Sequence, residues 1–227
     1  METGTGKTYT YIKTVFELNK RYGWSKFIVV VPSVAIREGV YKTFQITGDH
    51  FADEYEGKRC KFFIYNSAHT SEIRAFSADG GINVMIVNVQ AFNARGADAR
   101  RIYRELDSFN GVRPIDSIAA THPIVIIDEP QSVLGKKARE SLKDFKALFY
   151  LLYSATHREN FNKIYRLDAV DAYQRKLVKK IGVKGIEKVG DRASSGYLYL
   201  ERINTSSNSN PTATVMLEYS AADGSGK

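Results

Sequence analysis

The sequence predicts an α/β fold, a mostly parallel sheet with helices on both faces, followed by a C-terminal β-hairpin extension. Three observations carry this prediction. Short β-branched runs alternate with amphipathic helical patterns up to about residue 180, a glycine-rich loop occupies residues 1–8, and polar residues directly follow several strands. Because ligands bind at the carboxyl ends of parallel strands, we expect these polar residues to share one edge of the sheet with the loop.

The first eight residues, METGTGKT, have the composition of a loop that binds phosphate. Gly4 and Gly6 allow the backbone to approach an anion closely, so that its N–H groups point at phosphate oxygens. Lys7 supplies a positive charge for the phosphates, and Thr8 offers a hydroxyl to Mg²⁺. The full pattern G-x-x-x-x-G-K-S/T is met except at its first glycine, where Met1 stands. Such a loop normally follows a strand, and the sequence has none before Met1, so an ordinary turn before a helix is the alternative interpretation.

Apolar periodicity places the remaining elements in order along the chain. A helix is expected after the loop, with Tyr11, Ile12, Val15 and Phe16 on its buried face and its end at Gly23. Strands are expected at the apolar runs 26–31, 61–65, 82–89, 123–127 and 148–153. Further helices are expected at 34–45, 136–146, 160–165 and 170–177, whereas the polar stretches 48–58 and 108–122 are interpreted as loops. The runs KFIVVV at 26–31 and LFYLLY at 148–153 have the composition of buried strands.

The pattern changes after about residue 180. Strands are expected at 181–189, 196–203 and 212–219, and the polar Ser/Asn stretch between the last two indicates a β-hairpin rather than another strand–helix unit. The last residues, 221–227, have the composition of a frayed end. We therefore expect two domains, residues 1–180 with the α/β fold and residues 181–227 with the β extension and tail.

Composition limits the class of protein. The chain has 227 residues, 43% of them hydrophobic, which is a normal proportion for a globular core. It contains no apolar run as long as a membrane span and no signal-peptide pattern, and a single cysteine, Cys60, excludes an internal disulfide framework. A cytoplasmic location is therefore expected. The formal net charge of +8 fits a polyanionic partner such as nucleic acid, and it equally fits an ordinary solvated basic surface.

Acidic and hydroxyl residues follow two of the expected strands. Asp128 ends the run IVII, where it can hold Mg²⁺ opposite Lys7, and the adjacent Glu129 can orient or deprotonate an attacking water. A simple loop start is the alternative for this pair, and the phosphate loop earlier in the chain argues against it. Ser154 and Thr156 follow the run LFYLLY, where hydroxyls can hydrogen-bond the carboxylates of a metal site; an N-cap for the next helix is the alternative.

Together, GTGKT at 4–8, DEPQ at 128–131 and SAT at 154–156 are similar to the first three large motifs of superfamily 2 helicases and translocases. The resemblance narrows to the Res subunit of type III restriction–modification enzymes in four stretches. These are METGTGKTYTYIKT at 1–14, VIIDEPQSV at 125–133, YSATHR at 153–158 and IYRLDAVDAYQRKLV at 164–178. The form DEPQ, in place of DEAD or DEAH, is the most discriminating short piece. The resemblance implies a RecA-like P-loop NTPase lobe, the ATP-binding lobe of a helicase, in residues 1–180 and an inter-lobe extension in 181–227.

This resemblance implies a role for each matched residue. Gly4, Thr5, Gly6 and Lys7 would cradle the triphosphate of ATP, Thr8 and Asp128 would hold Mg²⁺, and Glu129 would be the catalytic base. Ser154 and Thr156 would couple the state of the nucleotide to the grip on DNA. Ser33 and Arg37 in VPSVAIR, and Gln90 in VNVQAF, stand where such motors contact a strand, so they are expected phosphate-backbone contacts. A solvated helix charge is the alternative for Arg37.

The resemblance also implies partners and a larger enzyme. The partners would be double-stranded DNA and the methyltransferase (Mod) subunit of the same system, and the whole enzyme would be an ATP-dependent site-specific deoxyribonuclease. Hydrolysis in superfamily 2 needs arginine fingers from a second lobe, for which this sequence has no room, and no nuclease acid/lysine cluster follows residue 180. We therefore expect a piece of the motor that begins inside its first lobe and is weakly active alone. The alternatives are another superfamily 2 DNA or RNA helicase lobe, or a lobe that binds nucleotide or DNA without turnover.

Overall fold

A computed structural model describes most of the chain. The described residues are 1–2, 4–67, 70–93, 101–155, 162–179, 196–204, 210 and 212–219. They fall into two compact units, Met1–Lys180 and Ile181–Lys227, and each is described here by itself. Among these residues, no helix has the length and apolar character needed to cross a lipid bilayer.

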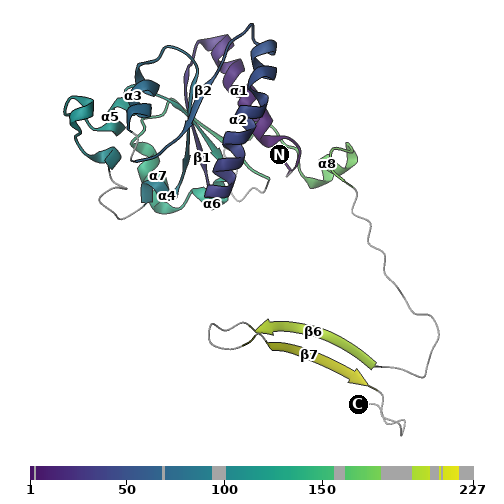
Figure 1. The fold of residues 1–227 in the computed structure, drawn as a ribbon. Coiled ribbons are helices and arrows are strands. Elements are labelled where there is room, and N and C mark those ends of the chain that lie inside the picture. Colours follow the sequence, from purple (N-terminus) through teal and green to yellow (C-terminus); the bar gives the residue numbers. More distant parts are fainter. Residues whose placement is uncertain are drawn as a thin grey trace. The chain divides into compact units, whose positions relative to one another are not determined.

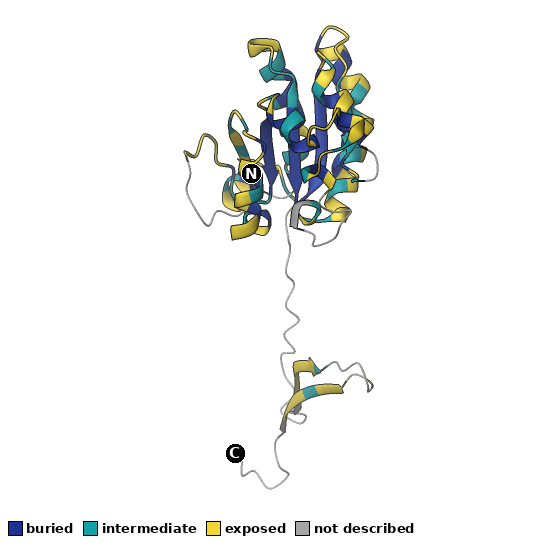
Figure 2. Ribbon diagram, turned by 90° about the vertical axis from the view of Figure 1, so that its left-hand side faces the viewer, coloured by how far each residue is buried: buried dark blue, intermediate teal, exposed yellow. Residues whose placement is uncertain are grey.

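The first unit is built around a five-stranded parallel sheet in the order β2-β3-β1-β4-β5. Its strands are β1 (Lys26–Val31), β2 (Lys61–Ile64), β3 (Asn83–Asn88), β4 (Ile124–Asp128) and β5 (Tyr150–Tyr153). The three central strands are the β-branched runs, and almost every residue in them is buried, as Figure 2 shows in dark blue. The predicted α/β fold with a mostly parallel sheet is confirmed.

Helices cover both faces of the sheet (Figure 1). On one face lie α1 (Lys7–Tyr22) and α2 (Val34–Glu54), which pack on alternate residues of β1 such as Phe27 and Val29. On the other face lie α3 (Ser71–Ala78), α5 (Pro114–Ala119) and α7 (Lys136–Lys143), which pack on Ile28 and Val30. Because side chains alternate along a strand, one run of β-branched residues serves both layers of the core.

The remaining helices are short and lie at strand ends or in connections. They are α4 (Gln90–Asn93), α6 (Pro130–Val133), α8 (Ala169–Gln174) and the 3₁₀ turns η1 (Arg101–Tyr103) and η2 (Asp107–Phe109). Asp168 caps α8 through a reciprocal capping box with Asp171, which explains why this helix begins where it does. The expected helix at 170–177 is therefore present but begins one residue earlier and ends at Gln174.

The loop expected at 48–58 is wrong in its first part, because α2 continues through Gly48 to Glu54. The continuation is held by packing at a distance in the sequence. The ring of Phe51 stacks on Phe16 of α1 with 5.1 Å between centroids, and Tyr55 stacks on the same ring at 5.0 Å. We refer to Phe16, Phe51 and Tyr55 as the aromatic layer. Their burial outweighs the modest cost of a glycine inside the helix.

Three other expectations differ from the structure. The loop expected at 108–122 contains α5, which starts with Pro114 at its first position and buries Ile115 and Ile118. The helix expected at 160–165 is absent from its described part, 162–165. The strand β5, expected to be buried, is an edge strand in which Tyr150 and Leu152 are exposed. The strand expected at 181–189 lies outside the described residues.

The second unit is an antiparallel hairpin of β6 (Gly196–Asn204) and β7 (Thr212–Tyr219), which confirms the expected C-terminal hairpin. A register shift between Leu200 and Arg202 adds one residue to β6. The pairing then places six aliphatic side chains on one face: Leu198, Leu200, Ile203, Ala213, Val215 and Leu217. All six are exposed within the described residues, and Figure 2 shows the hairpin mostly in yellow.

Candidate functional site

The loop before α1 has the backbone that its glycines predict. Gly4 and Gly6 have φ values of 78° and 83°, in the left-handed region that favours glycine. A Cβ at either position would meet no atom within 4 Å, so the backbone angle and not crowding requires glycine. Gly6 is the N-cap of α1 and no side chain caps the helix, so the first-turn N–H groups and the positive end of the helix are directed at the loop.

Lys7 begins α1 and points at the end of β4. Its Nζ lies 3.4 Å from Oδ1 of Asp128 and forms a closer ion pair with Oε1 of Glu129. The three side chains are between 6% and 21% exposed, so the interaction takes place largely out of water. Three predicted site residues, separated by about 120 positions in the chain, are thus brought together at the carboxyl edge of the sheet.

The charges of this cluster are not balanced, since one ammonium group faces two carboxylates. Burial raises the pKa of Asp128, and the neighbouring Lys7 acts in the opposite direction. Oδ1 of Asp128 is buried and makes no hydrogen bond to a described residue. A buried carboxylate beside a second acid, together with the Thr8 hydroxyl at the start of α1, suits Mg²⁺, which commonly uses one or two protein oxygens and takes its other ligands from phosphate and water. Among the described residues no group of three or more His, Cys, Asp and Glu residues forms a self-sufficient metal cage.

Glu129 is held in a strained conformation. Its φ of 51° lies in the left-handed region, which is unfavourable for a residue with a long side chain, and Pro130 follows it. The backbone N–H of Glu129 donates to the carbonyl oxygen of Tyr153 at 2.9 Å, which fixes the turn to the end of β5. Such strain persists where the surrounding structure enforces it, and it aims the carboxylate back toward Lys7.

Gln131 joins the two strand ends and was not among the predicted site residues. Its amide nitrogen donates to Oε2 of Glu129 at 2.5 Å, and its amide oxygen accepts from the hydroxyl of Ser154 at 2.9 Å. Ser154, only 5% exposed, is thereby connected to Glu129 through one side chain. The signal in the sequence was the amide three residues after Asp128, the acid that ends β4. Thr156, the other hydroxyl predicted here, lies outside the described residues.

The predicted DNA contacts lie at the neighbouring strand ends. Ser33 is the N-cap of α2 and accepts from the N–H of Ile36 at 3.3 Å, so its hydroxyl has a structural role. Gln90 donates to the carbonyl oxygen of Pro32 at 3.1 Å, which links the end of β3 to the end of β1. Arg37 pairs with Glu38 at 2.8 Å and is 20% exposed. These residues share the carboxyl edge with Lys7, but no hydrogen bond or ion pair among the described residues joins them to it.

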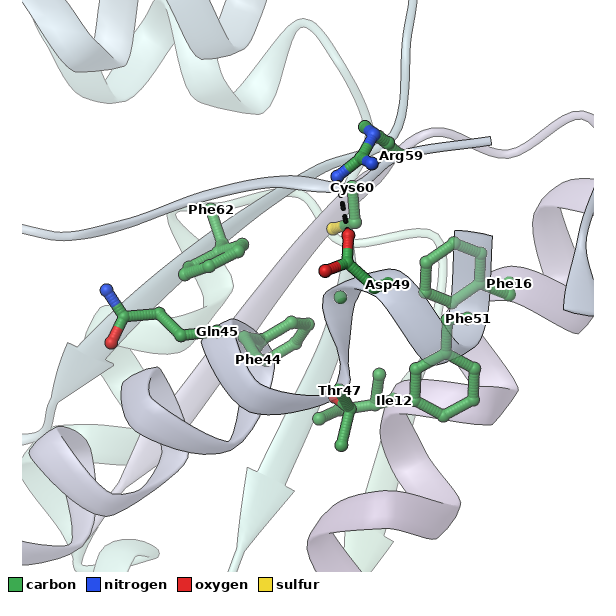
Figure 3. A pocket seen from close by; sticks show the side chains of 11 residues that line it. Ile12, Phe16, Phe44, Gln45, Thr47, Asp49, Phe51, Arg59, Cys60 and Phe62 are labelled. Atoms are coloured by element: carbon green, nitrogen blue, oxygen red, sulfur yellow. Dashed lines mark ion pairs between the residues drawn. The ribbon is translucent and has the colours of Figure 1, made fainter. Parts of the chain in front are cut away.

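A cavity of about 270 Å³ lies elsewhere, between α1, α2 and the start of β2. Figure 3 shows Phe44 and Phe62 on one side, Phe16 and Phe51 on the other, and the Asp49–Arg59 ion pair near Cys60. None of the predicted site residues lines this cavity. The candidate site residues therefore lie at the carboxyl edge of the sheet and not in this cavity.

Comparisons with known proteins agree with one another. The family model described as "Type III restriction enzyme, res subunit" matches residues 1–159. The chain is 36% identical over 200 residues to the Res subunit of the type III restriction-modification enzyme EcoP15I from Escherichia coli, an alignment that covers 80% of this chain and 20% of that protein. It is 35% identical, with the same coverage, to the EcoPI Res subunit of Escherichia phage P1. It is 27% identical over 232 residues to the StyLTI Res subunit of Salmonella typhimurium, covering 87% and 23% of the two proteins. The chain spans about a fifth of the length of these relatives.

Proposed function

The chain belongs to the Res-subunit family of type III restriction enzymes, and we propose that residues 1–180 are the ATP-binding lobe of the motor with which such a subunit moves along or opens DNA. One observation carries the proposal. Lys7, at the positive end of α1 and beside a glycine loop, faces the buried Asp128 and the partly buried Glu129 at the carboxyl edge of a parallel sheet. This arrangement matches the needs of a magnesium–nucleoside triphosphate, with cationic and N–H groups for phosphate and carboxylates for the metal.

In this proposal each side chain has a separate task. The backbone from Gly4 to Gly6, Thr5 included, and the ammonium group of Lys7 bind the triphosphate, while Thr8 and Asp128 provide the oxygens for Mg²⁺. When bound, Mg²⁺ offsets negative charge on the phosphates and helps to fix their position. Lys7 leaves its pairing with the acids for the phosphates, which frees the Glu129 carboxylate to accept a proton from the attacking water.

Gln131 and Ser154 extend the site to the end of β5, which we propose responds to the state of the nucleotide. Because Gln131 bonds both Glu129 and Ser154, a movement of Glu129 on nucleotide binding is transmitted to the end of β5. Thr156 is proposed to act with Ser154 in coupling that change to DNA. Ser33, Arg37 and Gln90 are proposed contacts to the phosphate backbone of double-stranded DNA, to which a net charge of +8 is suited.

The relatives are Res subunits of restriction-modification enzymes, so we propose a methyltransferase (Mod) subunit as the partner and restriction of foreign DNA as the process. We further propose that hydrolysis needs arginine side chains from a second lobe of such a subunit. The 227 residues alone would then bind nucleotide and show little ATPase activity that DNA stimulates. This second function, binding without turnover, is favoured because Lys7 and the two acids that it faces all lie within one compact unit.

The test measures binding of a fluorescent ATP analogue to the purified chain with Mg²⁺, and ATPase activity with and without duplex DNA. We expect binding that Lys7→Ala abolishes, because the variant loses the only cation seen at the acid pair among the described residues. Lys13→Ala is the matched control, since Lys13 is on the same helix and pairs with Glu54 at the surface. Unchanged nucleotide affinity in Lys7→Ala would count against the site, and strong DNA-stimulated turnover by the chain would count against the need for a second lobe.

A further inference from the structure

Tyr11 has a buried hydroxyl directly beneath the candidate site. It lies three residues after Thr8 and four after Lys7 on α1, a spacing that places the three side chains on one face of the helix. Tyr11 is 0% exposed, and its hydroxyl makes no hydrogen bond with acceptable geometry to a described residue. A buried hydroxyl without a partner is costly and uncommon, so its presence in this position calls for an explanation.

The surroundings of Tyr11 separate its ring from its hydroxyl. The ring packs edge-to-face against Tyr153 at a centroid distance of 5.5 Å, and this contact alone accounts for an aromatic residue here. The hydroxyl of Tyr153 is already engaged with Oγ1 of Thr14 at 3.0 Å, further along α1. The two hydroxyls of the pair therefore differ, since that of Tyr153 has a hydrogen-bond partner and that of Tyr11 has none among the described residues.

Three groups besides burial act on the pKa of Tyr11: Thr8 and Asp128 belong to the candidate cation site, and the third is Tyr153 of the ring pair. Burial raises its pKa most, the Thr8 hydroxyl lowers the pKa, and the charge of Asp128 raises it again. The phenol consequently stays protonated and able to donate at any ordinary pH. Asp128 has the complementary deficit, because its buried Oδ1 makes no hydrogen bond to a described residue and has Lys7 as its ion-pair partner.

We propose that Tyr11 is a positioning residue for the cation end of the nucleotide site, donating its hydroxyl hydrogen to Asp128 and accepting from Thr8 once Lys7 has moved to the phosphates. This inference rests on the proposed function, which supplies the reason for Lys7 to move. The hydrogen bond replaces the lost contact of Asp128 and holds both metal-binding oxygens in place. Groups that orient metal ligands in this way typically change metal affinity by about 10–100-fold when removed.

The experiment compares Tyr11→Phe with the wild-type chain and with Tyr153→Phe. Tyr11→Phe keeps the ring contact and removes only the hydroxyl, whereas Tyr153→Phe removes the satisfied hydroxyl of the same ring pair. Binding of a fluorescent ATP analogue is measured across a Mg²⁺ titration and again in EDTA. For Tyr11→Phe we expect the Mg²⁺ concentration for half-maximal binding to rise about 10-fold or more, with affinity in EDTA unchanged. For Tyr153→Phe we expect the Mg²⁺ dependence of the wild type.

The thermal midpoint of each variant without nucleotide provides a readout for a structural role. Tyr11→Phe is expected to be at least as stable as the wild type, since it removes an unpaired buried hydroxyl, while Tyr153→Phe loses a hydrogen bond. A wild-type Mg²⁺ dependence in Tyr11→Phe, or an equal shift in Tyr153→Phe, overturns the inference and leaves the proposed function standing. A wild-type chain that binds no nucleotide overturns the proposed function and this inference with it.

Discussion

The aromatic layer between α1 and α2 and the carboxyl edge of the sheet both include residues of α1 but depend on opposite kinds of interaction. In the layer, Phe16, Phe51 and Tyr55 are at most 3% exposed, and Phe51 and Tyr55 each stack on the ring of Phe16. At the edge, one cation faces two carboxylates in a largely dry site, and Glu129 is strained. Packing in the layer stabilises the folded state, whereas the unbalanced charges and the strain at the edge destabilise it.

The difference teaches where to look for function in this fold. Helix α1 is fixed to the sheet by its middle, through Ile12, Val15 and Phe16, and presents Lys7 and Tyr11 near its first turn. Removing a group from the middle should therefore cost stability and spare binding. Removing a group from the edge should cost binding and have a smaller effect on stability.

The largest effect on stability is expected from Phe51→Ala, which tests the layer side of the comparison. Loss of a fully buried ring that stacks on Phe16 should lower the free energy of unfolding by about 3–5 kcal/mol. Urea denaturation followed by circular dichroism measures this value. Ile46→Ala is the control, because Ile46 lies on the same helix at 71% exposure and should change stability by no more than about 0.5 kcal/mol. A loss below 1 kcal/mol in Phe51→Ala would show that the layer does not stabilise the fold.

A smaller effect is expected from Gln131→Ala, which tests the edge. The variant leaves Oε2 of Glu129 and the Ser154 hydroxyl without this bridge, so we expect a loss of about 1 kcal/mol. Because Ser154→Ala breaks the same chain of hydrogen bonds, the double variant should cost less than the sum of the two single variants. If the effects of the two single variants simply added in the double variant, that result would argue against the bridge. Gln45→Ala, at an exposed glutamine of α2, controls for the loss of an amide.

The smallest effect is a pH dependence that belongs to the layer. Hydrogen bonds from the Tyr55 hydroxyl, at 2.8 Å, and then from Arg21 lower the pKa of Glu17. A lowered folded pKa means that the stabilisation is fully present above the unfolded pKa of about 4.3 and is lost as pH falls through the folded value. Glu17→Gln should therefore have a lower thermal midpoint than the wild type at pH 7, and the two midpoints should converge below pH 4. Thermal melts across this range measure the difference, and Tyr55→Phe should largely remove it.

The sequence was sufficient to predict the central strands and the acid pair, because both follow local rules. The β-branched runs at β1, β3 and β4 specify burial on both faces, and Asp128 and Glu129 follow such a run directly. The full length of α2 was beyond local rules. Gly48 and the polar residues around it favour a loop, and the partner that holds Phe51 in the helix is Phe16, on a different helix. Packing between distant residues decided that segment.

The site was predictable in its charges and not in its connections. Gln131 acquires a role only when β4 and β5 are neighbours, since its two partners lie at the ends of those strands. The periodicity of α1 places the Tyr11 ring on the buried face and carries no information about its hydroxyl. Gln131 contacts two partners, and Tyr11 has both a packed ring and a buried hydroxyl. A pattern of polar and apolar positions gives only one property at each position.

The extra residue in β6 has a consequence for how this protein can be handled. The register shift after Leu200 places Ile203 on the same aliphatic face as Leu198 and Leu217, whereas regular alternation would place it on the opposite face. An exposed aliphatic face of this kind favours association between molecules as the protein concentration rises. We therefore expect the exposed aliphatic residues of the hairpin strands to affect the solubility of the chain more than its +8 charge does. A single substitution, Leu200→Lys or Val215→Lys, should therefore raise the solubility of the chain.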